Sequence, residues 1–282
     1  MADPLLSLPL HEVPFAVLDV ETTGLHPELG DAICEIAVLR VQDGQVREEY
    51  ETLVDPGRPI SADAYAVNQI SSELLRGAPP FSQIADEVLG RLEGAAAVAH
   101  NAPFDLSFLA AALEELHIPV LSNPVVDTLA LARNRYGFPR NNLHSIASDL
   151  GIVIPRRHRA LGDALATWRV LEFFSQDLQV RYGIGTLGEL VRAQGGPIPW
   201  PENLPRDILP AVLAEALDSR RALFLRYCSS EGDVTERTVE PLRVGLHQGA
   251  VYLIARCMLR GEQRTFRLDR VLEMRLHEMG QG

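Results

Sequence analysis

The sequence changes character near residue 178, and this change divides it into two parts that predict different folds. Residues 1–178 alternate between short apolar runs and stretches in which hydrophobic residues recur at helical spacing. The segment 179–206 is rich in glycine and proline, which is typical of a linker. From 207 to 282, one helix-like stretch precedes several strand-like runs. The sequence therefore predicts one domain at 1–178, a linker at 179–206 and a second domain at 207–282.

The first part predicts an α/β fold with a mixed sheet flanked by helices. Strand-like runs come first, and Asp43-Gly44 between two of them is typical of a hairpin turn. Short apolar runs then alternate with helices, which is the order expected of a sheet covered by helices. Strands are expected at 15–21, 32–41, 46–54, 95–100 and 125–127, and helices at 61–69, 84–92, 103–116, 142–150 and 160–177.

The last part predicts a small all-β domain. After a helix at 207–219, four runs of alternating hydrophobic and polar residues follow. Turn-forming residues separate them at 231–233, 248–249 and 260–261. Short strands at this spacing are typical of a small barrel.

The charge of the chain is unevenly distributed. The formal net charge is −12, and every basic residue is arginine. Against this acidic background, residues 128–162 contain six arginines and one acid, Asp149. Screening limits the reach of each charge to about 8 Å at physiological salt, so a local basic patch can bind phosphates on an acidic protein. The arginines of this patch are Arg133, Arg135, Arg140, Arg156, Arg157 and Arg159.

Several features of the sequence indicate in which cellular compartment the protein is expected. No apolar run reaches the roughly 20 residues that a membrane helix needs. The first residues have no basic region before an apolar run, so we do not expect a signal peptide. The three cysteines have no metal-ligand spacing and are expected to be reduced thiols in a cytoplasmic protein.

Two acids lie in an otherwise apolar strand. Asp19 and Glu21 are two residues apart, so their side chains point to the same face. Burying two neighbouring carboxylates is unfavourable because each loses hydration and repels the other. A divalent cation removes this penalty, since carboxylate oxygens are its preferred ligands. The pair is consistent with a metal site, and an exposed strand end is the alternative.

Three motifs taken together point to a known family. They are D-V-E-T-T-G (19–24), H-N-A-P-F-D (100–105) and H-R-A-L-G-D (158–163). Their order and spacing closely resemble the DEDDh exonucleases, the DnaQ-like family that includes polymerase III epsilon-type proofreading subunits, oligoribonuclease and ribonuclease T. The resemblance covers residues 13–178 and implies a ribonuclease H-like fold.

The resemblance also implies a mechanism. Asp19, Glu21, Asp105 and Asp163 would hold two Mg²⁺ or Mn²⁺ ions at the terminal phosphodiester of a nucleic acid. His158 would be the general base that takes a proton from the attacking water. The five catalytic residues expected from the resemblance are therefore Asp19, Glu21, Asp105, His158 and Asp163.

Residues next to these acids are expected to bind the substrate. By resemblance, the turn after Asp19 and Glu21 approaches the terminal nucleotide, and the end of the 95–100 strand lies beside it. Phe104 is a candidate for stacking on a base or for core packing. Asn101 and Asp127 also suit helix caps, and we interpret Asp127 as a cap. The substrate-binding set is Thr22, Thr23, Gly24, His100, Asn101 and Phe104.

The C-terminal part resembles a WYL domain. The similarity covers 207–278 and includes V-Y-L-I-A-R (251–256) and R-T-F-R-L-D-R-V (264–271), with Val251 in place of the usual tryptophan. Such domains resemble SH3- or Sm-like barrels and are thought to bind nucleic acids or nucleotides. Arginines interleaved with aromatic rings suit a single-stranded backbone, whereas a solvated barrel face is the alternative. The candidate nucleic-acid contacts are Tyr227, Arg256, Arg264, Arg267 and Arg270.

The sequence as a whole predicts a 3′→5′ exonuclease that acts on single-stranded DNA in repair or processing. The WYL-like domain would bind nucleic acid or regulate the enzyme. One alternative is an RNA-directed exonuclease of the oligoribonuclease kind, because no residue here identifies the sugar. Others are a non-enzymatic regulator that senses a ligand and a proofreading subunit bound to a polymerase. Oligomeric state, preferred metal and protein partners do not follow from the sequence.

Overall fold

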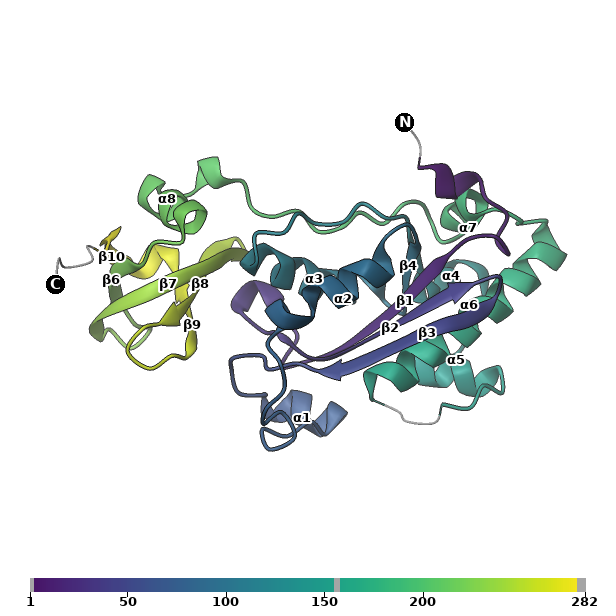
Figure 1. Ribbon diagram of the computed structural model, residues 1–282, viewed down its shortest axis with the longest axis horizontal. Coiled ribbons are helices and arrows are strands. Elements are labelled where there is room, and N and C mark those ends of the chain that lie inside the picture. Colours follow the sequence, from purple (N-terminus) through teal and green to yellow (C-terminus); the bar gives the residue numbers. More distant parts are fainter. Residues whose placement is uncertain (1–2, 155–157, 278–282) are drawn as a thin grey trace.

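The computed structural model describes residues 3–154 and 158–277 and contains two β-sheets (Figure 1). The first sheet has the strand order β3-β2-β1-β4-β5, and the second has the order β10-β6-β7-β8-β9. The predicted division into an α/β part and an all-β part is therefore confirmed. The arginines at 156 and 157 of the predicted basic patch lie outside the described residues.

The first sheet is mixed. Strands β1 (Phe15–Thr22), β2 (Ile33–Gln42) and β3 (Gln45–Leu53) are antiparallel neighbours. Asp43 and Gly44 between β2 and β3 both have positive φ, as the tight hairpin turn requires. Strands β4 (Ala96–Ala99) and β5 (Val125–Asp127) add in parallel beside β1.

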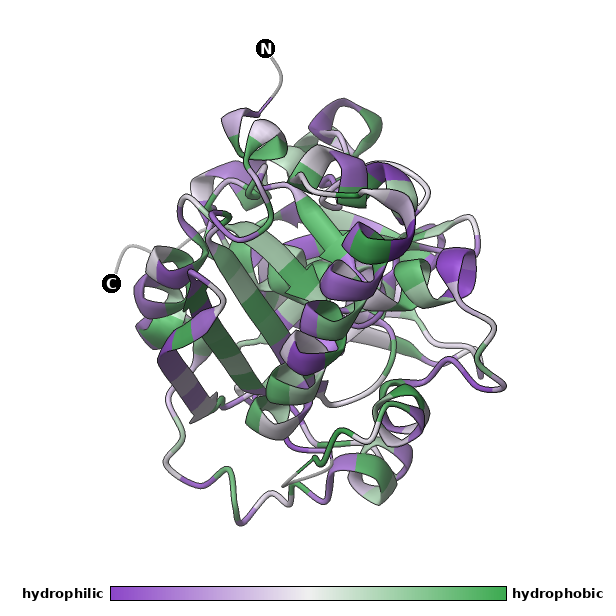
Figure 2. Cartoon of the chain, turned by 90° about the vertical axis from the view of Figure 1, so that its right-hand side faces the viewer, coloured by the Kyte–Doolittle hydropathy of each residue, from purple (hydrophilic) through white to green (hydrophobic). Residues whose placement is uncertain are grey.

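Helices cover both faces of this sheet. On one face lie α4 (Thr128–Arg135), α5 (Leu143–Asp149), α6 (Ala160–Tyr182) and α7 (Leu187–Ala193). On the other lie α2 (Phe81–Leu92) and α3 (Ala102–Glu115). Strand β1 alternates between the two cores, with Phe15 and Val17 in one and Ala16 and Leu18 in the other. Figure 2 shows the resulting arrangement, with hydrophobic strands in the middle and helices with more hydrophilic residues around them.

Short elements complete the first part. They are the 3-10 turns η1 (Pro4–Ser7) and η2 (Pro27–Leu29) and the helix α1 (Ala62–Asn68). Helix α6 is longer than the predicted 160–177 because the following chain stays helical until Gly183, whose φ of 69° suits a helix end.

The segment 179–206 contains the end of α6 and helix α7, and it packs on the first sheet's core. Trp200 is buried among the residues on the α2 and α3 side, and its indole N–H donates to the Asn123 carbonyl at 3.0 Å. The segment then continues to η3 (Arg206–Ile208). The domain limits at 178 and 207 stay predictions.

The second sheet is antiparallel throughout. Its strands are β6 (Leu223–Cys228), β7 (Val234–His247), β8 (Ala250–Cys257), β9 (Gln263–Arg267) and β10 (Val271–Leu276), with η4 (Leu268–Arg270) before the last. Helix α8 (Ala211–Ser219) covers one face and shares a core with Leu253 and Phe266. The described part of the chain contains no helix long and apolar enough to cross a membrane.

The two parts are in contact. The Arg243 guanidinium in β7 donates to Glu115 at the end of α3 at 3.0 Å, although only 3% of the Arg243 side chain is exposed. His117, just after α3, hydrogen-bonds the Leu217 carbonyl of α8 at 2.9 Å. Strand β7 also packs on η2, which follows the active-site strand β1 in the sequence. The second sheet therefore lies beside the end of the first sheet at which β1 finishes.

Candidate active site

The predicted acids of β1 meet an acid of α6. Asp19 and Glu21 lie at the end of β1, on the face that α6 covers, and Asp163 lies in the first turn of α6. One carboxylate oxygen from each of the three lies within 4.8 Å of the others. Two acids of β1 and a third acid more than 140 residues later in the sequence therefore lie close together.

Asp105 lies beside this group from the α3 side. It is buried in the first turn of α3, and its Oδ1 accepts a hydrogen bond from the Val20 N–H at 3.1 Å. Val20 stands between Asp19 and Glu21 in β1, so the bond fixes the Asp105 carboxylate next to both. Asp105 is nevertheless not part of the group whose oxygens all lie within 4.8 Å of one another, among the residues that the structure describes.

The acids are electrostatically unfavourable together. Burial, followed by the nearby carboxylates of Asp105 and Asp163, raises the pKa of Asp19 well above its usual value. Burial and then Asp163 raise the pKa of Glu21 to about 7. Burial also raises the pKa of Asp105. A divalent cation would stabilise the ionised forms, and the donor set, made only of carboxylate oxygens, suits a hard cation.

A buried ion pair positions α6, and the sequence did not predict it. Glu35 in β2 lies directly opposite Glu21 and is completely buried. The Arg159 guanidinium donates to both Glu35 oxygens, with Nε at 3.0 Å from each, and the Ala160 N–H donates to the same carboxylate at 3.0 Å. These contacts join the start of α6 to β2 and so fix Asp163 in front of β1.

Two histidines adjoin Asp163. His158 is exposed just before α6 with a φ of 56°, and its ring centroid lies 4.4 Å from that of His144 in α5. The His144 Nε2 hydrogen-bonds Asp163 Oδ1 at 3.1 Å. One nitrogen of each ring and an Asp163 oxygen lie within 4.8 Å of one another. His144 was missed at the sequence level because nothing in its helical segment links it to an acid 19 residues away.

Side-chain hydrogen bonds stabilise the turn after β1. The Thr22 hydroxyl donates to the Gly24 carbonyl at 2.6 Å, and the Thr23 hydroxyl donates to Asp31 at 3.3 Å. A Cβ on Gly24 would lie only 2.2 Å from the Asp31 carboxylate, so a larger residue at position 24 would displace the Asp31 side chain from this turn. Asn68, which the sequence did not single out, donates to the Thr22 carbonyl at 3.2 Å.

The second group of predicted substrate residues lies at the start of α3. His100 uses both ring nitrogens within the protein, to Thr128 at 2.8 Å and to the Asn141 carbonyl at 2.9 Å. A contact of His100 with substrate would require one of these bonds to break. Asn101 is exposed, has a φ of 73° and makes no side-chain cap. Phe104 is half-buried against Phe108, with ring centroids 5.0 Å apart.

Asp127 caps α4, as predicted. Its Oδ1 accepts from the Leu129 N–H and from the Asn101 N–H, both at 2.9 Å. The side chain therefore joins the segments that follow β4 and β5, and after burial its negative charge also contributes to the raised pKa of Asp105.

The predicted basic patch is only partly available to a phosphate. Arg159 is engaged by Glu35, and Arg135 Nε donates to the Ala193 carbonyl at 2.9 Å. Arg133 and Arg140 are exposed, and Arg140 lines a surface hollow together with His144. A cationic side chain therefore lies next to the histidines of the site.

The candidate contacts of the C-terminal part do not lie on one face. Directly paired residues share a face of an antiparallel sheet, and Arg267 pairs with Tyr252 whereas Arg264 pairs with Ala255. Arg256 and Arg267 therefore lie on the face toward η2, and Arg264 lies on the α8 face. On that α8 side, Phe266 is a buried core residue and the ring of Tyr227 contacts it, with centroids 5.2 Å apart. Arg270 lies in η4, between β9 and β10.

Three of these arginines have acidic neighbours. Arg256 pairs with Glu240 at 3.5 Å, Arg264 with Glu262 at 3.5 Å and Arg267 with Asp269 at 2.9 Å. These are exposed pairs, which contribute little to stability and which a phosphate can displace.

Comparisons with known proteins show which families the two parts of the chain resemble. A family model described as "Exonuclease" (RNase_T) matches residues 16–171, and a model described as "WYL domain" matches residues 209–276. The PolC-type DNA polymerase III of Streptococcus thermophilus is 37% identical over 185 residues, 65% of this chain and 13% of that protein. A polymerase III subunit epsilon-like protein of Rhodobacter capsulatus is 40% identical over 193 residues, 66% of this chain and 27% of that protein. The chain thus corresponds to a small part of these relatives.

Solved structures share the fold. Exonuclease X, solved in complex with a 5′-overhanging duplex DNA, is 27% identical, with a TM-score of 0.50 over 64% of this chain and 99% of that one. Exonuclease I of E. coli, solved with single-stranded DNA, has a TM-score of 0.55 over 86% of this chain and 54% of that one, at 17% identity. The matched family model covers more than half of the chain, and its range contains all five residues of the expected catalytic set. The chain therefore belongs to the exonuclease family, with DnaQ-like polymerase III exonucleases among its homologues, and it carries a WYL domain on its C-terminal side.

Proposed function

We propose that the chain is a metal-dependent 3′→5′ exonuclease that releases nucleoside monophosphates from single-stranded DNA. The observation that carries the proposal is the convergence of Asp19, Glu21 and Asp163 within 4.8 Å, with Asp105 and His158 beside them. This constellation is the expected catalytic set, and it is built from three distant segments of the chain.

The four acids would hold two Mg²⁺ or Mn²⁺ ions. When bound, such ions lower the pKa of a coordinated water and stabilise the charge that develops on the leaving 3′ oxygen. The protein's own contribution is to fix the acids before the metal arrives. The Val20 N–H fixes Asp105, and the Glu35–Arg159 ion pair fixes the helix that carries Asp163.

His158 would take the proton of the attacking water at a ring nitrogen. The imidazole is exposed, so it can return that proton to solvent after each cleavage, and it lies next to Asp163 without being buried among the acids. His144 hydrogen-bonds Asp163 and would orient that carboxylate.

The substrate would contact the turn at Gly24, the start of α3 at Asn101 and the guanidinium of Arg140. Asn101 is exposed at the start of α3, and Arg140 is exposed beside His144. Thr22 and Thr23 would act mainly by shaping the turn, because their hydroxyls are used inside it. The preference for DNA is supported by the relatives named as DNA polymerases and by exonuclease X with its DNA.

The test is digestion of oligonucleotides labelled at the 5′ or the 3′ end, as single-stranded DNA, duplex DNA and RNA, with Mg²⁺, Mn²⁺ or EDTA. We expect mononucleotides released from the 3′ end of single-stranded DNA only when a divalent cation is present. Asp19→Asn should lower the rate by at least about 10²-fold with the fold retained, since it removes a proposed metal ligand.

Asp86→Asn, at an exposed acid of α2, is the matched control and should leave the rate unchanged. Undiminished cleavage by Asp19→Asn would refute the assignment. Faster digestion of RNA than of DNA would mean that RNA is the substrate in place of DNA. Binding of the oligonucleotides without any cleavage would favour a ligand-sensing regulator.

A further inference from the structure

One face of β7 packs closely against η2, the segment that follows the active-site strand β1. Arg243 donates to the Pro27 carbonyl, and a Cβ on Gly245 would lie 2.1 Å from the Glu28 carbonyl oxygen. Only glycine therefore allows β7 to approach η2 this closely. His247 is the next residue on the same face, and the close backbone contact places it against Glu28.

A second strand holds the same segment. The Gln263 side chain of β9 donates to the Gly30 carbonyl at 2.9 Å, and the Thr265 hydroxyl donates to the Leu29 carbonyl at 2.6 Å. The turn from His26 to Gly30 is thus held by side chains from two strands of the second sheet.

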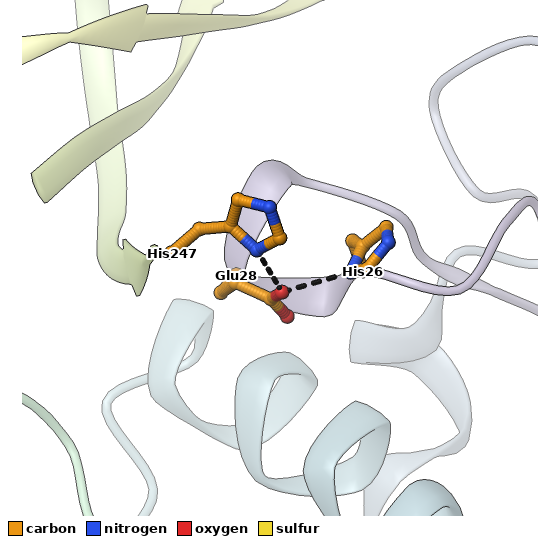
Figure 3. Close-up of side chains that lie close together, drawn as sticks. All are labelled: His26, Glu28 and His247. Carbon is orange, nitrogen blue, oxygen red and sulfur yellow. Dashed lines mark hydrogen bonds and ion pairs between the residues drawn. The ribbon is translucent and has the colours of Figure 1, made fainter. Parts of the chain in front are cut away.

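Two histidines share one carboxylate at this contact, as Figure 3 shows. His26 Nδ1 lies 2.9 Å from Glu28 Oε1, and His247 Nδ1 lies 2.8 Å from the same oxygen. The ring centroids are 4.8 Å apart and nearly perpendicular. The three donor atoms all lie within 4.8 Å of one another, although they come from the two different parts of the chain.

The carboxylate of this cluster favours its ionised form. Burial raises the pKa of Glu28, but hydrogen bonds from its own backbone N–H and from the two imidazoles outweigh this and hold the pKa below its usual value. The shared oxygen is therefore an anionic ligand at neutral pH, and the Nδ1 of each imidazole points toward it.

We propose that His26, Glu28 and His247 form a binding site for a divalent transition-metal ion of the Zn²⁺ class that joins the WYL domain to the exonuclease domain. Two imidazoles and one carboxylate are a ligand set that Zn²⁺ accepts, with water in the fourth position. On binding, the proton on each Nδ1 is transferred to Nε2 by way of solvent, so both imidazoles coordinate the metal as neutral rings.

The geometry fits such an ion after a small movement. Ligands of a tetrahedral Zn²⁺ lie about 3.3 Å apart, given metal–ligand distances of about 2.0–2.1 Å. The two nitrogen–oxygen distances here are 2.8 and 2.9 Å and would lengthen by about half an ångström, while the two imidazole nitrogens would have to reach the same separation of about 3.3 Å from within 4.8 Å. About half of the His26 side chain is exposed, which gives an ion access from solvent.

The ligands also distinguish this site from the acids of the exonuclease domain. The acids of the active site offer only carboxylate oxygens, which suit Mg²⁺ and Mn²⁺, whereas imidazole nitrogens favour Zn²⁺. His144, His158 and Asp163 form another group of two imidazoles and one carboxylate, so the experiment must disable that group as well. The site adjoins the active-site turn, because Asp31 accepts hydrogen bonds from the His26 N–H and from Thr23. Metal binding would therefore stiffen the turn that carries Thr22 and Thr23.

The experiment uses the full chain with Asp19→Asn, Asp163→Asn and His158→Ala, which weaken the two other groups of described residues that could hold a metal ion. Zn²⁺ is titrated calorimetrically into this metal-stripped protein, and Co²⁺ is titrated while the visible absorption is recorded. We expect one equivalent of Zn²⁺ to bind, a tetrahedral Co²⁺ spectrum without a thiolate charge-transfer band, and a rise in Tm with Zn²⁺. Adding His247→Ala should weaken Zn²⁺ binding on the order of 10²-fold and remove the rise in Tm.

His11→Ala, at an exposed histidine outside the cluster, is the matched control and should bind Zn²⁺ like the parent. Glu28→Gln and His247→Gln provide independent ligand losses with smaller changes of shape, and the Tm without metal reports whether each variant folds. The proposal is overturned if the parent binds no Zn²⁺ with these signatures, or if folded ligand variants bind it as tightly as the parent does.

Discussion

At the level of single residues, His158 differs from the acids around it because its side chain is exposed. If it takes the proton from water, His158→Ala should reduce kcat by on the order of 10²–10⁴-fold and change KM little. The fall in rate at acidic pH, where an imidazole becomes protonated, should disappear in the same variant. Initial rates of single-stranded DNA digestion across pH measure both effects, with His11→Ala as control. A variant that keeps the parent rate and pH profile would exclude His158 as the base.

Glu21 makes the stability of the metal-free protein depend on pH. Its pKa is raised from 4.5 to about 7, with burial as the main cause, so the folded state favours the protonated form. The stabilising contribution is complete below about pH 4.5 and is lost as the pH rises through 7. In EDTA, we expect this single group to lower the free energy of unfolding by roughly 3 kcal/mol across that window.

Urea denaturation at several pH values measures this dependence. Glu21→Gln should remove that part of the slope, and saturating Mn²⁺ should reduce it because the cation stabilises the ionised acid. The same slope in Glu21→Gln and in the parent protein would contradict the assignment to this carboxyl.

At the level of elements, the join between β2 and α6 determines whether Asp163 faces β1. Glu35 is completely buried and its charge is compensated by Arg159 and the Ala160 N–H. Removing Arg159 leaves that charge unpaired, and Arg159→Ala should therefore destabilise the protein by about 3 kcal/mol. We also expect reduced cleavage, because the start of α6 loses its anchor.

Thermal and urea denaturation measure the loss, with Arg169→Ala as control. Arg169 forms an exposed pair with Glu172 in the same helix, and its removal should cost less than about 0.5 kcal/mol. Equal stabilities of the two variants would show that the buried pair does not anchor α6.

Much of the fold follows from local patterns. The apolar run of β1 and the Asp43-Gly44 turn predicted the first strands, because each depends only on neighbouring residues. The helix ends were less predictable, as α6 shows by continuing to Tyr182. Its end is set by Gly183 and by packing on the first sheet's core, and the sequence pattern weakens before that point.

The site residues that belong to a sequence motif were predictable, whereas those that reach the site only through tertiary contacts were not. Asp19, Glu21 and Asp163 were expected from the motifs, and the structure brings them together. Glu35 and His144 were missed, because their partners lie 124 and 19 residues away and only the packing of α5 and α6 brings them together.

At the level of the whole molecule, the second sheet presents two unlike faces. One face shares a core with α8, and the other donates hydrogen bonds from β7 and β9 to carbonyls of η2. Arginines that are close in sequence are therefore divided between the faces, because strand residues three apart point in opposite directions. The face with Arg256 and Arg267 packs on η2, next to the turn that follows β1, so we expect a strand leaving the active site to meet this face.

This placement predicts how the WYL domain contributes to binding. In an Asp19→Asn background that preserves the substrate, Arg256→Gln with Arg267→Gln should weaken single-stranded DNA binding and reduce the slope of log affinity against log salt by about 1.4, if each arginine neutralises one phosphate. Fluorescence anisotropy at several salt concentrations measures the slope. The matched control is Arg47→Gln with Arg181→Gln, which removes two exposed arginines of the exonuclease domain that pair with Asp43 and Asp177. If both double variants lower affinity and slope equally, the effect is one of net charge and the WYL face makes no specific contact. If only the WYL variant changes the slope, the second sheet binds the strand that the first domain cleaves.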